Sequence, residues 1–304
     1  MTVWDFWMMV RPDPRWALGS SLLVLSLACS SAWATQDEVA LPIDTREALL
    51  FDQDDSEVRP LSGATGLIDV AAYPLGEGHH HWHGKVKGDI ALLTRGDDLV
   101  WHASLAVETV ADDQNEIDFR LVRLFYRFRV AVDFRLGPGM FWVALDHRCG
   151  HGTDGALPGR ILIRSGIEAG YRVAMRWDAL ELALTAEAHG TILGQNTDLD
   201  SQMRGLFAVA GQVAYALPAN FRVLAGVGLG AALVGQGPSD VYLVSDRARH
   251  LRAEPLPAAV VGVAYDGAAA SLGVMLHFQR TLDTGLTETS QPASLLSRRI
   301  GFAW

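Results

Sequence analysis

The sequence is poor in cysteine, and after its N-terminus it has no long apolar run. Of 304 residues only Cys29 and Cys149 are cysteines, and the first lies in a segment that we expect to be removed. A framework of intramolecular disulfides is therefore excluded. No segment after residue 34 reaches the roughly 18 consecutive apolar residues of a membrane-spanning helix. Strand pairing and side-chain packing must hold the chain together.

The chain also lacks an excess of positive charge and the motifs that bind nucleotide cofactors. Its formal net charge of −10 at pH 7 argues against nucleic acid as a partner. It has no Walker motif, no Gly-rich dinucleotide fingerprint and no zinc-protease helix motif. We therefore expect no cofactor. The acidic balance also suits the extracellular loops of an envelope protein.

The N-terminus has the pattern of a secretion signal. Two arginines precede an apolar run at 16–29, and Ala32-Trp33-Ala34 has the small-x-small form of a signal-peptidase site. The run is shorter than a membrane-spanning helix. We expect residues 1–34 to be a signal peptide. An initiation site at Met8 or the following methionine, and a lipoprotein signal ending at Cys29, are the alternatives.

From residue 66 onward, apolar residues recur at every second position, and 30 glycines punctuate the chain. This pattern suits strands that face lipid on one side and water on the other. Tight turns such as Arg95-Gly96-Asp97 and Gly137-Pro138 alternate with longer loops, of which 235–256 is the longest. About twelve strands are expected, near 66–75, 83–94, 98–111, 117–136, 139–150, 160–177, 179–193, 203–217, 220–234, 257–266, 268–281 and 294–304.

Charged and apolar residues fall on opposite faces of these strands. On the strand at 117–136, Tyr126 and Phe128 alternate with Arg127 and Arg129. A charge facing lipid near the middle of the membrane costs about 2–4 kcal/mol, so the charged faces should line the lumen. The expected lumen residues are Arg123, Arg127, Arg129, Arg148, Arg164, Glu168, Arg172, Arg176, Glu181 and Glu187.

The chain ends inside an alternating strand, with Ile300, Phe302 and Trp304 on one face. This terminus resembles the aromatic-ended closing strand of Gram-negative outer-membrane barrels, which their assembly machinery reads. The resemblance implies an all-β fold, an antiparallel transmembrane β-barrel in the outer membrane. It also implies three partners: outer-membrane lipid, lipopolysaccharide and, through Trp304, the barrel assembly machinery. The oligomeric state stays open.

Three regions follow from these patterns. Residues 1–34 form the signal peptide and residues 66–304 form the barrel. Between them, residues 35–65 are acidic and weakly patterned. We expect this segment to be a periplasmic lead-in or a plug.

The arginine-rich lumen has two interpretations. The charges could pair with one another and fill the interior, or they could form a cationic wall that favours anions in a narrow pore. The sequence favours a passive structural or pore-like role, with weak anion selectivity, over an enzyme. It does not identify a solute.

A group of reactive side chains lies at the outer end of the fifth expected strand: His147, Cys149, His151 and Asp154. The outer-membrane phospholipase A has His-x-Ser on a lipid-facing strand, and His147 and Cys149 have the same spacing, although the Asn-Gly that follows in the phospholipase is absent here. The four residues also fit the frame of uncharacterised envelope barrels with the motif His-x-Ser-Ser-His-x-Gly-Asp, which has two differences here. These resemblances imply a lipid-modifying acyl hydrolase as an alternative function.

The expected strand register argues against catalysis. Pairing of the fifth and sixth strands through the loop at 151–159 places His147 opposite Ile163 and Cys149 opposite Ile161. Ser165 then lies two residues away from the histidine, which has no group to orient it unless the register slips by two residues. We therefore expect no catalytic residues here and a polar rim at the level of the lipid headgroups.

A histidine-rich segment at 79–83 falls in the first expected extracellular hairpin. Imidazoles bind zinc, copper and nickel, and His79, His81 and His83 would share one face of an extended segment. A metal-binding or adhesive surface protein is thus a further alternative. A solvated loop with Trp82 at the membrane interface is the simpler interpretation.

Overall fold

The computed structural model describes residues 58–74, 81–96, 98–113, 116, 119–152, 161–197, 202–267, 270–282 and 292–304. The expected signal peptide and most of the acidic segment lie outside these ranges. Within them, no helix has the length and apolar character needed to cross a membrane.

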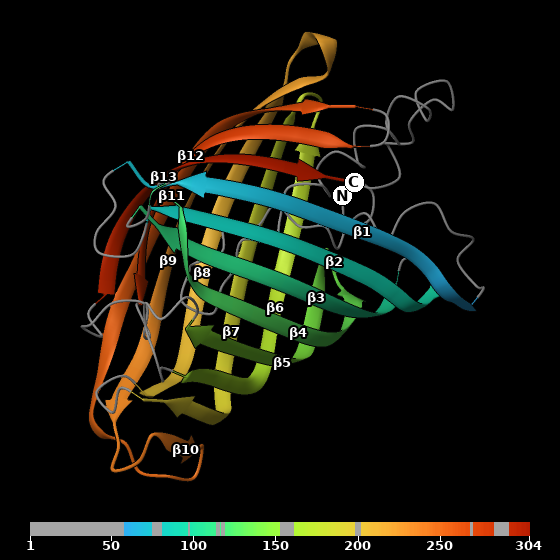
Figure 1. Ribbon diagram of the computed structural model, residues 1–304. Coiled ribbons are helices and arrows are strands. Elements are labelled where there is room, and N and C mark those ends of the chain that lie inside the picture. The colour runs from blue at the N-terminus through green and yellow to red at the C-terminus, as the bar shows by residue number, and fades with distance from the viewer. Residues whose placement is uncertain are drawn as a thin grey trace.

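Twelve long antiparallel strands form a closed barrel (Figure 1), as the sequence predicts. Each strand pairs with its neighbours in the chain, and the last strand pairs with the first. The strands are β1 (Val58–Ala72), β2 (Trp82–Arg95), β3 (Leu99–Asp112), β4 (Arg120–Leu136), β5 (Gly139–Gly152), β6 (Ile161–Trp177), β7 (Leu180–Asn196), β8 (Gln202–Ala216), β9 (Phe221–Gln236), β11 (Arg249–Asp266), β12 (Ser271–Leu282) and β13 (Pro292–Ala303).

Tight connections join β2 to β3, β4 to β5, β6 to β7, β8 to β9 and β11 to β12, where the sequence predicts them. The connection from β8 to β9 is a single 3₁₀ turn, η3 (Pro218–Asn220). Gly96 and Gly137 have φ values of 48° and 60°, a region that glycine enters without steric cost. Short turns are typical of the periplasmic end of an outer-membrane barrel, and these five connections lie at one end of the strands.

The two faces of the wall differ in chemistry. On β5, Val143 and Leu145 are 42% and 63% exposed on the outer face, whereas Asp146 and Arg148 are 3% and 4% exposed on the inner face. β13 repeats the pattern, with Ile300 exposed and its neighbour Arg299 buried. A polar interior inside an apolar outer wall is the arrangement that lipid requires.

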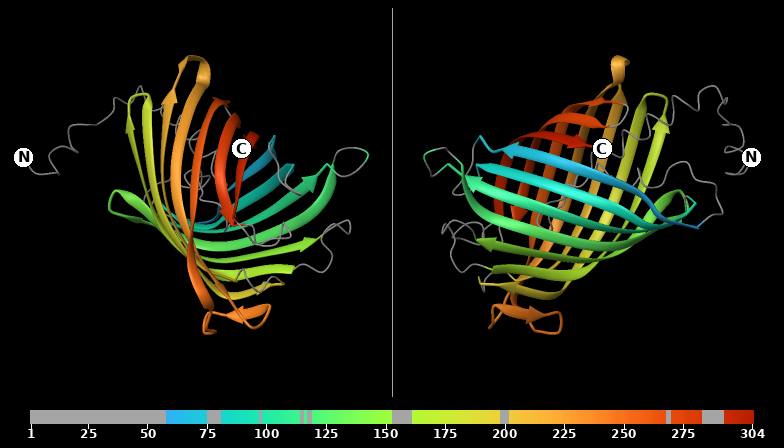
Figure 2. Two further views of the ribbon diagram at one scale, coloured as in Figure 1. Left: turned by 90° about the vertical axis from the view of Figure 1, so that its left-hand side faces the viewer. Right: turned by 45° about the vertical axis from the view of Figure 1, so that its right-hand side comes forward.

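The barrel closes between β1 and β13, which lie side by side in both views of Figure 2. The backbones of Gly66 and Trp304 exchange two hydrogen bonds, of 2.9 and 3.1 Å. The Trp304 ring covers Gly66 so closely that a Cβ atom there would collide with it. The absence of a side chain at Gly66 therefore leaves room for the ring of Trp304.

Two expected boundaries are wrong. β1 begins at Val58 rather than near residue 66, because its first residues pair with the end of β2, where Val58 lies opposite Arg95. The expected loop at 235–256 is shorter, because β9 and β11 continue their pairing to Gln236 and Arg249. Between them the short strand β10 (Val241–Leu243) pairs with β7.

We predict that Gly66→Val lowers the yield of folded protein several-fold, because a branched side chain displaces the Trp304 ring from the closing seam. Gly88→Val is the matched control, because a Cβ atom at Gly88 meets nothing within 4 Å. The folded fraction is measured by heat-modifiable migration of outer-membrane fractions. Equal yields of the two variants would contradict this role for Gly66. Deletion of Trp304 should have the same effect as Gly66→Val.

Candidate functional site

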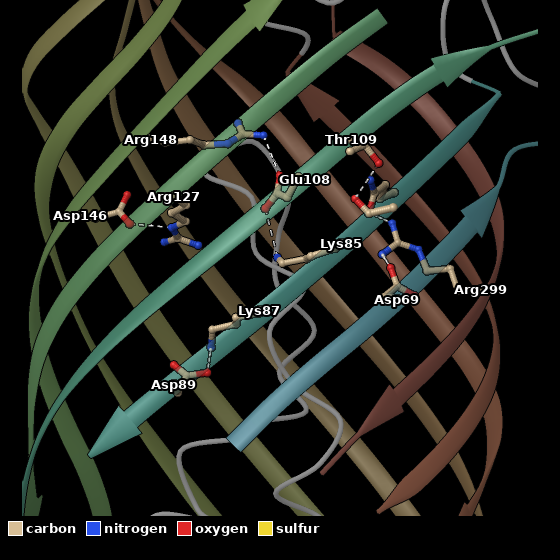
Figure 3. A network of polar contacts seen from close by, with 12 residues as sticks. Asp69, Lys85, Lys87, Asp89, Glu108, Thr109, Arg127, Asp146, Arg148 and Arg299 are labelled. Carbon is tan, nitrogen blue, oxygen red and sulfur yellow. Dashed lines mark hydrogen bonds and ion pairs between the residues drawn. The ribbon is translucent and has the colours of Figure 1, made fainter. Parts of the chain in front are cut away.

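The inner wall carries a network of ion pairs that joins neighbouring strands (Figure 3). Glu108 on β3 lies 3.2 Å from Lys85 on β2 and 3.0 Å from Arg148 on β5. All three side chains are nearly fully buried. The guanidinium of Arg148 also lies 4.0 Å from the centre of the Phe125 ring. One buried carboxylate thus compensates two cations from different strands.

A second part of the network centres on Glu168 of β6. It accepts hydrogen bonds from Arg127 at 3.2 Å, from Arg129 at 3.0 Å and from Nε1 of Trp142 at 2.7 Å. Arg127 also donates to Asp146 at 2.6 Å. Hydrogen-bonded partners are what make buried charges tolerable. The network therefore ties β4, β5 and β6 together from the inside.

The ion pairs continue at other positions of the wall. Lys87 pairs with Asp89 at 2.8 Å, and Arg299 of β13 lies 3.9 Å from Asp69 of β1 (Figure 3). Further contacts on the inner face are His102–Asp133 and Arg222–Asp266, both at 3.2 Å. Charges of both signs thus lie close together at several positions of the inner wall.

The ten residues expected in the lumen all lie in the described part of the chain. Seven of these residues are 6% exposed or less: Arg123, Arg129, Arg148, Arg164, Glu168, Arg172 and Glu181. Arg127 is 15% exposed, and Glu187 is half-buried. Arg176 is different, because it lies near the C-terminal end of β6, is exposed, and pairs with Glu181.

Part of the interior is apolar, which sequence reasoning missed. β8, β9, β11 and β12 bring together a buried cluster of Met203, Leu206, Ala208, Ala210, Ala232, Val234, Leu256, Ala258 and Leu282. The outer faces of these strands are apolar too, for example at Phe207 and Leu233. Alternation of charged and apolar residues therefore could not assign their faces. Small residues at alternate positions were the available signal.

The outer wall of β5 and β6 carries a polar pair. Nδ1 of His147 and Oγ of Ser165 lie 2.8 Å apart on the exposed face. His147 pairs with Ser165 and Cys149 pairs with Ile163, so the register expected from the sequence is wrong by two residues. The expected neighbour on the other side, Phe128, does lie opposite His147. The argument against catalysis rested on the lack of a partner for His147. In the structure, Ser165 is that partner.

Cys149 lies two residues further along the same face of β5. Positions i and i+2 of a strand are roughly 6.6–6.8 Å apart, a separation that two side chains can bridge. The thiol is free and partly buried, and Tyr126 and Ile163 lie opposite it on the neighbouring strands. His151 follows on the same face, whereas Asp154 lies outside the described residues.

The histidine-rich segment is only partly described, because His79 lies outside the described residues. His81 is 3.5 Å from Asp113, and His83 is 5% exposed on the inner wall. The described residues contain no group of three or more His, Cys, Asp or Glu side chains placed to hold a metal ion.

Comparison with known proteins finds only distant structural similarity. No family model and no curated protein matches the sequence. LpxR from Salmonella typhimurium has a TM-score of 0.47 at 10% identity, covering 78% of this chain and 99% of that one. Outer membrane phospholipase A from Escherichia coli has 0.42 at 11%, covering 79% and 95%. The KdgM porin, in complex with oligogalacturonate, has 0.39 at 9%, covering 79% and 97%. An activity does not follow from similarity at this level.

We predict that Glu108→Ala destabilises the barrel by about 3–5 kcal/mol, because Lys85 and Arg148 are then buried without their carboxylate. Asp98→Ala is the control. Asp98 pairs with Arg135 at 3.4 Å but is 77% exposed, and exposed pairs contribute about 0–1 kcal/mol. Urea unfolding in detergent micelles measures both. Equal midpoints for the two variants would contradict a structural role for the buried network.

Proposed function

We propose that this chain is an outer-membrane barrel of a Gram-negative bacterium that cleaves ester-linked acyl chains of outer-leaflet lipid at its outer wall. The observation that carries the proposal is the 2.8 Å contact between His147 and Ser165 on the exposed face. Cys149 is the nucleophile, His147 is the base, and Ser165 orients the base. The sequence favoured a passive role because this third residue was expected elsewhere.

The polar side chains of His147 and Ser165 are not expected on the lipid-facing surface of a barrel with a purely structural role. Their surroundings are apolar, with Phe128 and Ile167 51% and 45% exposed on the same face. Polar groups that face lipid destabilise a barrel unless they find partners. Stability alone would favour apolar residues at these positions. A chemical role explains why a histidine, a serine and a thiol occur there together.

The contact defines what each ring nitrogen of His147 can do. With Nδ1–H donating to Oγ of Ser165, the lone pair of Nε2 is available to accept the proton of the Cys149 thiol. A serine orienter is uncharged and stabilises an imidazolium less than a carboxylate does. A thiol tolerates this, because thiols give up their proton far more readily than hydroxyls do. An uncharged orienter, Ser165, is therefore compatible with a thiol nucleophile, Cys149.

The reaction proceeds in two steps. His147 takes the proton of Cys149, and the thiolate attacks the ester carbonyl carbon. A C–S bond forms, the ester C–O bond breaks, and the departing alcohol takes the proton from His147. Water then attacks the thioester with His147 as base. The fatty acid leaves, and the thiol recovers its proton.

The position of the site selects the substrate. Cys149 lies near the extracellular end of β5, which ends at Gly152, so the thiol is close to the outer interface where acyl esters meet water. Glycerophospholipid and lipopolysaccharide both present such esters. The apolar side chains on the same outer face provide a surface for the acyl chain.

We predict that the purified protein releases fatty acid from lipid in mixed micelles. Cys149→Ala should abolish the release. His147→Ala should slow it by roughly 10²–10⁴-fold, as expected for loss of a general base. Ser165→Ala should slow it about tenfold, the effect of one hydrogen bond. Phospholipid and lipopolysaccharide are assayed separately, with and without calcium.

His151→Ala is the matched control for these variants. It removes a histidine from the same face, two residues beyond Cys149, where the opposite residues are Leu124 and Ile161. Its activity should equal that of the wild type. Absence of fatty-acid release from folded wild-type protein on both lipids would overturn the proposal. So would release that persists in Cys149→Ala.

We propose a passive, weakly anion-preferring pore as a second candidate. The observation that favours it is the excess of cations on the inner faces of β4, β5 and β6. These faces carry six arginines and three carboxylates: Arg123, Arg127, Arg129, Arg148, Arg164 and Arg172, with Asp133, Asp146 and Glu168. Positive potential at these arginines favours anions in a narrow lumen, and salt screens it.

We predict a small conductance in planar bilayers, with a preference for chloride over potassium that falls as ionic strength rises. Replacing Arg127 and Arg164 with glutamate should reduce or reverse the preference. Arg135→Glu is the control, because its side chain is 47% exposed near the β4–β5 turn. A preference for cations in the wild type, or no conductance under any condition, would contradict this second candidate.

A further inference from the structure

An arginine interrupts the apolar outer face of β13. Arg298 is exposed and lies between Leu296 and Ile300 on that face. The residues opposite it on the two neighbouring strands are Ala72 of β1 and Leu276 of β12. Neither of these side chains can pair with a cation. A charge on a lipid-facing wall is costly without a partner, so this guanidinium is suited to an anion that approaches from the membrane side.

Arg298 lies at one rim of the barrel. Its partner Ala72 is the last residue of β1, and Ala72 in turn lies opposite Trp82, the first residue of β2. The tight turn from β2 to β3 is at the other end of β2. Short turns are typical of the periplasmic side, and tryptophan is enriched at membrane interfaces. We therefore expect Arg298 to lie near the headgroups of the outer leaflet.

A second arginine lies on the same face, further toward this rim. Arg280 of β12 lies opposite Ser294, which is exposed, whereas Arg298 lies opposite Leu276. The two arginines are thus offset by four residues along the strands, which corresponds to about 13 Å. We name Arg280 and Arg298 the cationic rim.

Arg280 has hydrogen-bond donors to offer to a ligand. Its Nη2 atom lies 3.6 Å from a carboxylate oxygen of Glu254 on β11, which Arg252 also contacts at 2.7 Å. A separation of 3.6 Å is longer than a hydrogen bond. A guanidinium carries five N–H donors, and its planar fork matches the oxygens of a phosphate. Arg280 can therefore contact Glu254 and bind an anion at the same time.

The wall around the two arginines is apolar. Between them, Phe278 and Leu296 lie opposite each other, and on the other side of Arg298 the next pair is Val274 and Ile300. Phe278, Val274 and Ile300 are all exposed. A ligand that matches this surface has acyl chains, ring faces that can pack on an aromatic side chain, and phosphate groups at two depths.

We propose that the cationic rim binds one molecule of lipopolysaccharide through its phosphates, with the acyl chains along Val274 and Ile300. Lipopolysaccharide carries phosphates on its acylated disaccharide and on sugars further from the membrane, whereas a glycerophospholipid carries its phosphate at one depth. The site lies on β12 and β13 beside β1 (Figure 1), and four strands separate β13 from β5. It does not rest on the proposed acyl transfer.

Binding to full-length protein in non-ionic detergent tests the proposal. All variants are made in a Cys149→Ala background, so that hydrolysis through this thiol cannot consume the ligand. The probes are purified lipopolysaccharide, the same lipopolysaccharide with its phosphates removed, and phosphatidylglycerol. Native mass spectrometry compares Arg280→Gln and Arg298→Gln, singly and together, with the parent. Arg135→Gln is the matched control, because it removes an exposed arginine near the β4–β5 turn. Heat-modifiable migration verifies folding.

Each cationic-rim variant should bind lipopolysaccharide about tenfold more weakly, as expected for the loss of a charged hydrogen bond. Arg135→Gln should bind as the parent does, and Arg298→Lys should keep part of the affinity, because it retains the charge without the fork. Equal binding by the folded double variant and the parent would overturn the site. Equal binding of dephosphorylated lipopolysaccharide would do the same. If phosphatidylglycerol binds as tightly and with the same dependence on both arginines, the ligand is not lipopolysaccharide in particular and the assignment is wrong.

Discussion

The cost of exposing charge to lipid determines where the charged side chains of this barrel lie. Arg129 and Glu168 meet inside because neither could face the membrane. Inside the barrel these charged side chains need partners, and the partners lie on neighbouring strands. The cost of exposing charge to lipid therefore produces ion pairs that join the strands. Strand closure follows the same logic, because an open edge has no place in lipid. The Gly66–Trp304 seam removes that edge.

Polar side chains that face lipid despite this cost are informative. His147 and Ser165 face outward, where most neighbouring side chains are apolar, and they satisfy each other with one contact. Their hydrogen bond lowers the cost of placing them there without removing it. A site that works on membrane lipid must face lipid, and it must hold a base in a fixed orientation. The arrangement of His147, Ser165 and Cys149 meets both requirements with three side chains on two strands.

Much of the fold could be predicted from the sequence, because period-two alternation marks each strand and charge marks the inner face of β4 to β7. The site could not. The register of β5 on β6 depends on a loop whose length does not fix the pairing, and a shift of two residues keeps every side chain on its face while changing its neighbour. His147 thereby gained Ser165 in place of Ile163. The inner faces of β8 to β12 could not be predicted either, because both faces of these strands are largely apolar.

The central claim is that Cys149 carries an acyl group during turnover, and intact-mass spectrometry tests it most directly. Folded protein is mixed with a short-chain phospholipid and quenched in acid within seconds. The account predicts a mass increase of one acyl group, mapped to Cys149, removed by hydroxylamine, and absent in His147→Ala. Protein that stays unmodified in the presence of substrate, or an acyl group on another residue, would contradict it.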